Sequence, residues 1–249
     1  MPQKLGQHFL ADNSVLTRIA GTVCPEVGQI PDLVIEIGPG KGALTEKLLD
    51  RAARVVAIEL DRSLVDHVRT RFPTPRLEVI HADVLTVDLA QWGRVPLVGN
   101  LPYYITSPIL EKAVRLSPPR AVFLMQKEVA ERLVAKPGTR DYGYLTVQTA
   151  MFAAARILFD VKPGAFRPPP KVDSSVVLLE PRDSAIADSD AFLEFVGRCF
   201  RQKRKMLRNN LAGFYAKDRI DSLPEAGMRA EQLSLDRLLS AFYSITSTS

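Results

Sequence analysis

The stretch Leu33-Val34-Ile35-Glu36-Ile37-Gly38-Pro39-Gly40-Lys41-Gly42 decides the fold class of this chain. Its first half is a short apolar run typical of a buried strand, and its second half is rich in glycine, which lets a ligand approach the backbone. The residues that follow, 43–49, have the pattern of a helix. This order predicts a ligand-binding unit of strand, turn and helix. Several cofactors are bound by such a turn, including nicotinamide dinucleotides, so the turn alone does not say which.

Further apolar runs follow, and each ends close to a polar side chain. The runs with their polar residues are Arg54–Ile58 with Glu59, Leu77–His81 with Asp83, and Val95–Gly99 with Asn100. The carboxyl ends of parallel strands meet at one edge of an open α/β sheet, where ligands bind. We therefore expect Gly38, Glu59, Asp83 and Asn100 to line one site. Glu59 also stands about 20 residues after the glycines, where a dinucleotide-binding fold places its ribose-binding carboxylate.

Strands and helices alternate over roughly residues 12–160, which predicts an α/β fold with a doubly wound, mostly parallel sheet. Helices are expected at Asn13–Val23, Arg62–Arg71, Thr106–Arg115 and Lys127–Ala135, and further strands at Ala121–Met125, Ala155–Val161 and Ser175–Leu179. Later, apolar positions recur at helical spacing in Ala191–Phe200, Met206–Phe214 and Gln232–Tyr243. We predict a large domain over residues 1–182 and a small helical domain over residues 190–249, joined by the polar segment Pro181–Asp190.

The segment Asn100-Leu101-Pro102-Tyr103 suits a flat ring that carries an amine. The exocyclic amine of adenine is a poor nucleophile, because its lone pair is delocalised into the ring. The Asn100 side-chain oxygen and the Leu101 carbonyl can accept the two amine hydrogens. Pro102 can fix the turn, and Tyr103 can stack on the base. The hypothesis is that an adenine is held here for methylation, by positioning and electrostatic fit. A plain strand-end turn with a core tyrosine is the alternative.

Segments along nearly the whole chain resemble the KsgA family of ribosomal RNA adenine N6,N6-dimethyltransferases, which use S-adenosylmethionine. The resemblance is carried, in order, by Leu5–Leu10, Glu36–Gly40, Val56–Asp61, Gly99–Tyr103, Met125–Val129, Phe166–Ser174 and Arg201–Asn209. It implies a Rossmann-like class I methyltransferase fold with a small C-terminal α-helical domain. Tyr104 and Thr106 stand where asparagine and serine are common in the family, and His8 stands where asparagine is frequent.

The resemblance also implies roles for single residues. The implied cofactor-binding residues are His8, Leu10, Gly38, Gly40, Glu59, Asp83 and Asn100. Among them, Glu59 would bind the ribose hydroxyls and Asp83 would hold the cofactor adenine. The implied catalytic residues are Asn100, Leu101, Pro102, Tyr103 and Phe166. In this set, Tyr103 and Phe166 would lie on the two faces of a target adenine flipped out of its stack.

Composition and charge fit a soluble protein with a polyanionic partner. The chain has 249 residues, 46% of them hydrophobic, and a formal net charge of +5, which suits RNA without requiring it. Cys24 and Cys199 form no paired motif, so we predict neither a disulfide nor a metal site, and we expect a reducing, cytoplasmic location. The N-terminus has no secretion signal, and no apolar run approaches the ~20 residues of a membrane span. We expect a monomer without a membrane partner.

Six cations and no acid lie between Arg198 and Arg208. Like charges at helical spacing repel by ~0.2–0.5 kcal/mol per pair, and a phosphate-rich partner would relieve that repulsion. A solvated helix face is the alternative interpretation. We predict that RNA is bound by Arg201, Lys203, Arg204, Lys205 and Arg208.

These features predict a methyltransferase that acts on adenine N6 in small-subunit ribosomal RNA, with the small ribosomal subunit as partner. The resemblance implies two methyls on each of two adjacent adenines near the RNA 3′ end, in a partly assembled subunit. Three alternatives are open: an Erm-type enzyme of large-subunit RNA, a mainly nonenzymatic assembly factor, and a nicotinamide-dependent oxidoreductase. The segments 166–174 and 201–209 argue against the first, the four strand-end residues against the second, and the segment 100–103 against the third.

Overall fold

The computed structural model describes residues 8–25, 30–182, 186 and 188–246. The first three residues of the predicted segment Leu5–Leu10 and part of the predicted connection Pro181–Asp190 lie outside the described residues. The chain divides into two compact units. One unit comprises Met1–Ala130 and Ala153–Arg182 and is built on a sheet. The other comprises Glu131–Phe152 and Asp183–Ser249 and is helical.

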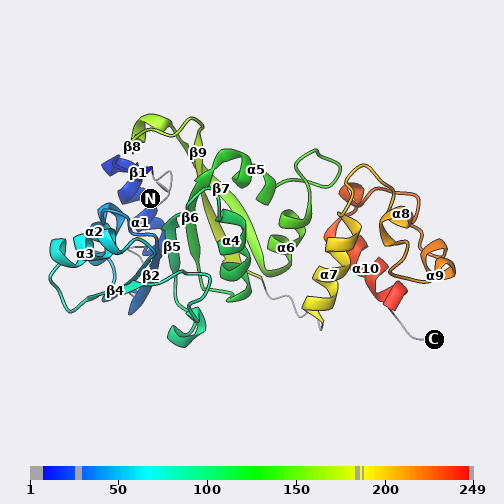
Figure 1. The fold of residues 1–249 in the computed structure, drawn as a ribbon, viewed down its shortest axis with the longest axis horizontal. Coiled ribbons are helices and arrows are strands. Elements are labelled where there is room, and N and C mark those ends of the chain that lie inside the picture. The colour runs from blue at the N-terminus through cyan, green and yellow to red at the C-terminus, as the bar shows by residue number, and fades with distance from the viewer. Residues whose placement is uncertain (1–7, 26–29, 183–185, 187, 247–249) are drawn as a thin grey trace. The chain divides into compact units, whose positions relative to one another are not determined.

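The first unit contains a seven-stranded sheet with the order β4-β3-β2-β5-β6-β9-β7 (Figure 1). Its strands are β2 (Leu33–Ile37), β3 (Arg54–Glu59), β4 (Leu77–His81), β5 (Leu97–Asn100), β6 (Ala121–Gln126), β7 (Ala153–Val161) and β9 (Ser174–Pro181). Strands β2 to β6 are parallel, whereas β9 is antiparallel to both of its neighbours. The predicted doubly wound, mostly parallel sheet is confirmed. The order along the chain reverses between β2 and β5, which is where such sheets bind ligands.

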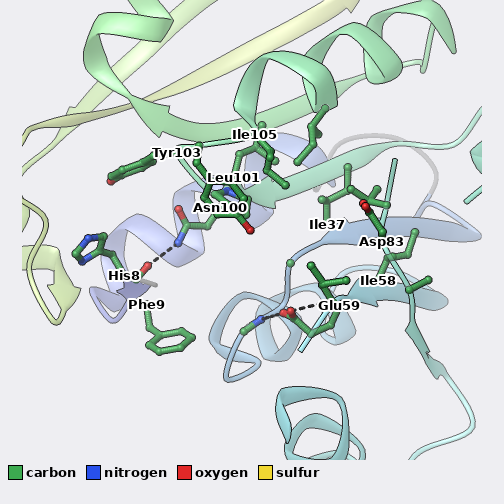
Figure 2. Close-up of a pocket in the computed structure, with 18 residues that line it drawn as sticks. His8, Phe9, Ile37, Ile58, Glu59, Asp83, Asn100, Leu101, Tyr103 and Ile105 are labelled. Atoms are coloured by element: carbon green, nitrogen blue, oxygen red, sulfur yellow. Dashed lines mark hydrogen bonds between the residues drawn. The ribbon is translucent and has the colours of Figure 1, made fainter. Parts of the chain in front are cut away.

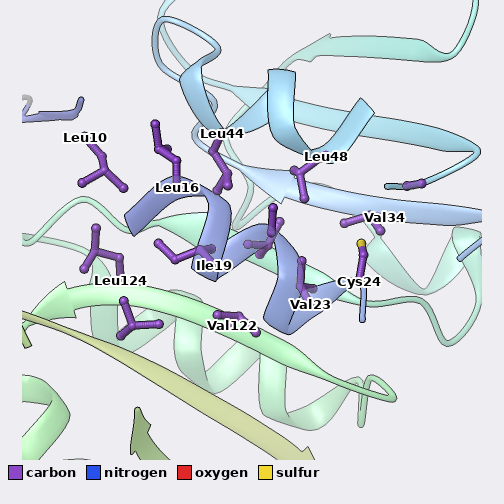
Figure 3. Packing of buried hydrophobic residues seen from close by; sticks show 14 of the residues in the cluster. Leu10, Leu16, Ile19, Val23, Cys24, Val34, Leu44, Leu48, Val122 and Leu124 are labelled. Atoms are coloured by element: carbon purple, nitrogen blue, oxygen red, sulfur yellow. The ribbon is translucent and has the colours of Figure 1, made fainter. Parts of the chain in front are cut away.

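Helices connect the strands, and several of them bury apolar residues. They are α1 (Asn13–Val23), α2 (Ala43–Leu49), α3 (Arg62–Arg71), α4 (Thr106–Arg115), α5 (Lys127–Leu133) and the short η1 (Leu89–Trp92) and η2 (Pro163–Ala165). In α1 the buried residues Leu16, Ile19 and Val23 pack between α2 and β6 (Figure 3). Each such side chain contributes about 1.5–3 kcal/mol. This core fixes the strands whose ends carry the predicted site residues.

Two short strands far apart in the sequence pair with each other, which was not predicted. Strand β1 (Phe9–Leu10) is antiparallel to β8 (Phe166–Arg167), with Leu10 opposite Phe166 (Figure 1). Both of these side chains are buried in the core that contains α1. Residues 8–10 are therefore attached beside the ends of β2 and β5.

The second unit is a cluster of short helices. They are α6 (Tyr144–Phe152), α7 (Ser189–Cys199), α8 (Leu207–Leu211), α9 (Lys217–Asp221), η3 (Ala230–Gln232) and α10 (Leu235–Thr246). The rings of Phe192, Phe195 and Phe242 meet in its core at centroid distances of 5.5–6.5 Å. The predicted helix over 206–214 is shorter in the structure, because Gly213 has a φ of 86° and the helix ends before it.

The boundary between the units differs from the predicted one in one segment. Residues 131–152 were expected within the large domain, but Tyr142, Val147 and Met151 are buried in the core of the helical unit. Helix α6 is apolar on several sides, so its sequence pattern indicates burial without indicating which core receives it. The two cysteines lie in separate cores, Cys24 in the sheet unit and Cys199 in the helical unit.

Candidate active site

The ends of the central strands surround a cavity of about 100 Å³. Gly38, Glu59, Asp83 and Asn100 all line it, so the structure brings together the four strand-end residues selected from the sequence (Figure 2). Gly38 and Asp83 come just after β2 and β4, and Glu59 and Asn100 are the last residues of β3 and β5. The parallel register of these strands places their carboxyl ends at one edge, which explains how residues up to 62 positions apart in sequence reach one site.

The turn after β2 depends on glycine. Gly40 has a φ of 56°, in the left-handed region that glycine adopts easily. A Cβ at this position would lie 2.9 Å from the Phe9 ring, so glycine also allows β1 to pack against the turn. The Gly40 N–H donates to the Glu59 Oε2 at 3.2 Å, which ties the turn to the end of β3 (Figure 2).

Backbone N–H groups orient the Glu59 carboxylate. Its Oε1 accepts from Leu60 and Asp61 at 2.9 and 3.0 Å, and its Oε2 accepts from Gly40. Burial raises the pKa of Glu59, although these three hydrogen bonds oppose the shift. A carboxylate held in one orientation at a cavity wall suits hydroxyl donors such as those of a ribose.

Strand β5 approaches β2 closely just before Asn100. A Cβ on Gly99 would lie 2.4 Å from the Ile37 carbonyl oxygen, so this approach requires glycine. The Asn100 Nδ2 donates to the His8 carbonyl at 3.0 Å. Because a carbonyl can only accept, the amide nitrogen must face His8, and Oδ1 is the acceptor on the other side. Figure 2 shows Oδ1 directed away from the His8 carbonyl.

The residues after Asn100 form a tight turn anchored at both ends. The Leu101 N–H donates to the Leu124 carbonyl at 2.9 Å, which keeps Leu101 buried beside β6. The Pro102 carbonyl accepts from the Ile105 N–H at 3.1 Å and from the Thr106 Oγ1 at 3.0 Å. These bonds close a four-residue turn that leads directly into α4.

Tyr103 is held in place on the N-terminal side of the cavity. Its hydroxyl lies 2.8 Å from the Ser174 Oγ. Its ring stacks on the His8 imidazole, with 5.9 Å between ring centroids and 29° between planes. The His8 Nδ1 donates in turn to the Pro168 carbonyl at 2.9 Å. Burial raises the pKa of Tyr103, and the hydrogen bond with Ser174 opposes that shift.

A second cavity, of about 330 Å³, adjoins the first. The two share Phe9, Gly38, Gly40 and Asn100 in their walls. The second cavity is also lined by the predicted Leu10. Three charged residues that were not predicted as part of the site line it too: Glu36, Lys41 and Arg167. Asn100 therefore stands where the two cavities meet. Such a pair suits an elongated ligand with different polar groups at its two ends.

Glu36 is a functional candidate that sequence reasoning missed. It lies inside β2, is 1% exposed, and accepts a 2.6 Å hydrogen bond from the Thr45 Oγ1. Burial raises the pKa of Glu36 to about 8; the Thr45 bond opposes the shift, and the Glu59 charge adds to it. A cation bound beside it would favour its ionised form. Only its acidic character in an otherwise apolar strand could have indicated it from sequence.

Replacing Glu36 with glutamine should remove a pH dependence of stability from the cofactor-free protein. The folded-state pKa is raised, so the folded protein holds a proton that the unfolded chain releases above pH 4.5, and stability falls as pH rises to about 8. The slope attributable to Glu36 is about 1.4 kcal/mol per pH unit. Urea unfolding from pH 5 to 9 should show the variant gaining on the wild type until about pH 8. A pH-independent difference would contradict this.

The structure does not place Phe166 where the resemblance implied. Its side chain is fully buried in the core that contains α1 and lines neither cavity. Pairing of β8 with β1 turns this ring inward opposite Leu10, and exposes Arg167 to the second cavity instead. In this arrangement Phe166 does not face a base, and a stacking role requires β8 and the residues after it to move.

The predicted RNA-binding cations lie in the helical unit, four of them on the loop between α7 and α8 and the fifth, Arg208, in the first turn of α8. Helix α7 ends at Cys199 and α8 begins at Leu207. The buried Asn210 side chain holds the loop between them, donating to the carbonyls of Cys199 and Gln202 at 2.7 and 3.2 Å. The exposed cations are Arg201, Lys203, Arg204, Lys205 and Arg208. A loop fixed at its base presents these charges to solvent together.

Two further features of the described residues bear on function. No group of three or more His, Cys, Asp or Glu side chains among them could hold a metal ion. Within the same part of the chain, every helix is too short or too polar to cross a membrane.

The fold and the paired cavities define a class I S-adenosylmethionine-dependent methyltransferase. The residues fit that cofactor: Glu59 suits the ribose hydroxyls, and the buried Glu36 suits a cationic amino group in the adjoining cavity. A solved structure of a putative class I methyltransferase from Listeria monocytogenes has the same fold, with a TM-score of 0.55 at 13% identity over 75% of this chain and 64% of that one.

The chain belongs to the ribosomal RNA adenine dimethylase family, whose model matches residues 2–247. A ribosomal RNA small subunit methyltransferase A from Xanthomonas euvesicatoria is 45% identical over 94% of this chain and 92% of its own length. A protein of the same name from Chlorobium luteolum is 41% identical over 96% of this chain and 88% of its own length. Membership of this family excludes the oxidoreductase alternative.

Two solved structures are similar over nearly the whole chain. A dimethyladenosine transferase from Plasmodium falciparum has a TM-score of 0.81 at 28% identity, covering 94% of this chain and 96% of that one. The 23S ribosomal RNA methyltransferase ErmE has a TM-score of 0.70 at 28% identity, covering 96% of this chain and all of that one. The site is therefore set in a fold that this chain shares with both enzymes.

Proposed function

We propose that this protein transfers methyl groups from S-adenosylmethionine to N6 of adenines in the RNA of the small ribosomal subunit. The Asn100 amide is the observation that carries this proposal. Its nitrogen is held by the His8 carbonyl, so its oxygen is an acceptor at the wall shared by the two cavities. When bound, S-adenosylmethionine supplies an electrophilic methyl group on its sulfonium.

The chain's own residues prepare the amine of the target base. The Asn100 Oδ1 accepts one N6 hydrogen and the Leu101 carbonyl accepts the other. These bonds draw the nitrogen lone pair out of conjugation with the ring, toward the geometry of the transition state. Pro102 and the turn after it hold both acceptors at a fixed spacing. The proton that N6 loses passes to water, so no strong base is required.

Tyr103 supplies a stacking face for the target base. Its ring is held by Ser174 and His8, so little conformational freedom is lost when a base stacks on it. A base paired in a helix must be flipped out to reach this ring. We further propose that Phe166 covers the opposite face only after residues 166–170 rearrange on RNA binding, because the ring is buried in the structure.

The names of the relatives support the small subunit as the target. Relatives at 41–45% identity are named for that subunit, whereas the large-subunit enzyme ErmE shares 28%. Two methyls on each of two adjacent adenines near the RNA 3′ end, in a partly assembled subunit, is the specific form of the proposal. It rests on the resemblance of the site segments to the KsgA family.

Labelled methyl transfer to small subunits that lack adenine methylation tests this function. Large subunits and protein-free RNA serve as parallel substrates, and nucleoside analysis identifies the product. Dimethyladenosine in the small subunit alone is the expected result. Label in large-subunit RNA would replace the proposal with the Erm-type activity. Tight subunit binding without label would make the protein an assembly factor without catalysis.

We propose that the loop between α7 and α8 binds ribosomal RNA through its phosphates. Its four exposed cations and the adjacent Arg208 of α8 supply the charge, and the Asn210 hydrogen bonds keep the loop in one conformation. Phosphate contacts provide affinity and register, while the pocket provides the chemistry. We also propose that this protein is a monomer and is located in the cytoplasm.

Replacing Arg204 and Lys205 with alanine should weaken RNA binding and flatten its salt dependence. Each lost phosphate contact lowers the slope of log K against log salt by about 0.7–0.9, so the double variant should lose about 1.4–1.8 from the slope. Binding to small-subunit RNA across a salt series measures it. The control is Arg62→Ala with Lys217→Ala, which removes two exposed cations elsewhere. Equal slopes for the two double variants would locate the RNA surface away from this loop.

A further inference from the structure

The turn after β5 carries two adjacent aromatic rings, and the catalytic scheme uses only one. The 3.1 Å bond between the Pro102 carbonyl and the Ile105 N–H makes Tyr103 and Tyr104 the two central residues of this turn. Tyr103 lies beside His8, away from Asp83, at one end of the pocket in Figure 2. Tyr104 also lines the cavity, although its side chain has no role in the reaction described above.

The surroundings of Tyr104 are those of the opposite end of the cavity. The negative charges of Asp83 and Glu59 both act on its phenol: burial raises the pKa of Tyr104, and these two carboxylates raise it further. Tyr104 lines this cavity together with Glu59 and Asp83, the residues that suit an adenosine. Tyr104 is 58% exposed, whereas Ile58 and Ile109, which line the same cavity, are buried.

An exposed aromatic ring beside buried apolar side chains can stack on a flat ligand ring that enters the cavity. A purine ring inserted between these isoleucines and Tyr104 would bury both of its own faces. It would also cover one face of the Tyr104 ring. Stacking of a base on an aromatic side chain contributes about 1–3 kcal/mol. Asparagine, which is common at this position in the family, could not provide such a face.

We propose that Tyr104 covers the adenine ring of the bound cofactor from the solvent side. In this arrangement the Tyr103 ring contacts the target adenine, and the Tyr104 ring contacts the adenine of the cofactor. The ring face makes the contact, so the phenolic hydroxyl is dispensable. This chain has a tyrosine where asparagine is common in the family. We therefore expect it to bind the cofactor more tightly than it would with an asparagine at position 104.

Equilibrium binding of S-adenosylhomocysteine, measured by calorimetry, tests this without any turnover. Tyr104→Ala should bind about tenfold more weakly than the wild type, and Tyr104→Phe should stay within about twofold of it. The control is Tyr243→Ala, which removes a ring of similar exposure in the helical unit and should leave the affinity unchanged. Thermal unfolding without ligand verifies that each variant is folded.

Each of the other outcomes overturns the proposal in a distinct way. Tyr104→Ala binding within twofold of the wild type would mean that the ring does not cover the cofactor. If Tyr104→Ala retained full affinity for S-adenosylhomocysteine but bound small subunits more weakly, the ring would face RNA. An equal loss in Tyr104→Phe would assign the contact to the hydroxyl. A wild type that fails to bind S-adenosylhomocysteine would overturn the cofactor assignment itself, and this inference with it.

Discussion

Replacing Asn100 with alanine is expected to lower kcat for methyl transfer by about 10²–10³-fold, the usual cost of removing one acceptor or donor that acts on the transition state. The variant loses the oxygen proposed to accept an N6 hydrogen and the nitrogen that donates to the His8 carbonyl. Initial rates of labelled transfer to small subunits, with both substrates saturating, measure the change. Affinity for S-adenosylhomocysteine should fall by only a fewfold, because other cavity residues are intact.

Asn100→Asp separates the two functions of the amide. Aspartate keeps an acceptor oxygen but places its other oxygen against the His8 carbonyl, where two acceptors repel. We expect activity well below the wild type, because the acceptor is no longer oriented. A fully active aspartate variant would show that the bond to His8 is unnecessary. Turnover of the alanine variant within about fivefold of the wild type would remove Asn100 from the reaction altogether.

The sheet could be predicted because its strands are buried on both faces. Parallel strands of this kind appear in a sequence as continuous apolar runs, as 33–37, 54–59 and 121–126 do here. The same property made the site partly predictable. Each run ends where the chain returns to solvent, so the first polar residue after it marks the ligand-binding edge. Glu59, Asp83 and Asn100 followed from this rule, and Gly38 from the glycine-rich turn after the first run.

The parts that were not predicted depend on contacts between distant residues. Strand β1 is two residues long and pairs with a strand more than 150 positions later, so no local pattern indicates it. Its consequences are the orientation of the Asn100 amide, the burial of Phe166 and the placing of Arg167 at the second cavity. The burial of Glu36 was not predicted for the same reason, because it depends on contacts with Thr45 and the surrounding core.

Replacing Tyr103 with alanine is expected to lower kcat/KM for the small subunit by roughly 5–150-fold, which corresponds to the 1–3 kcal/mol of a base stacked on an aromatic ring. Tyr103→Phe keeps the ring and loses only its bond to Ser174. It should lose no more than a fewfold. Steady-state kinetics with the subunit as the varied substrate provide both values.

Comparing the loss of activity with the loss of cofactor affinity in Tyr103→Ala shows whether Tyr103 contacts the target base or the cofactor. The ring lies beside His8, on the side of the cavity away from Asp83 (Figure 2), so Tyr103→Ala should bind S-adenosylhomocysteine almost as the wild type does. Ser174→Ala is the matched test of the tether, since it removes the same hydrogen bond from the other partner. It should behave like Tyr103→Phe. If the alanine variant at 103 lost cofactor affinity in proportion to its activity, Tyr103 would serve the cofactor, and the target base would lack the stacking face proposed for it.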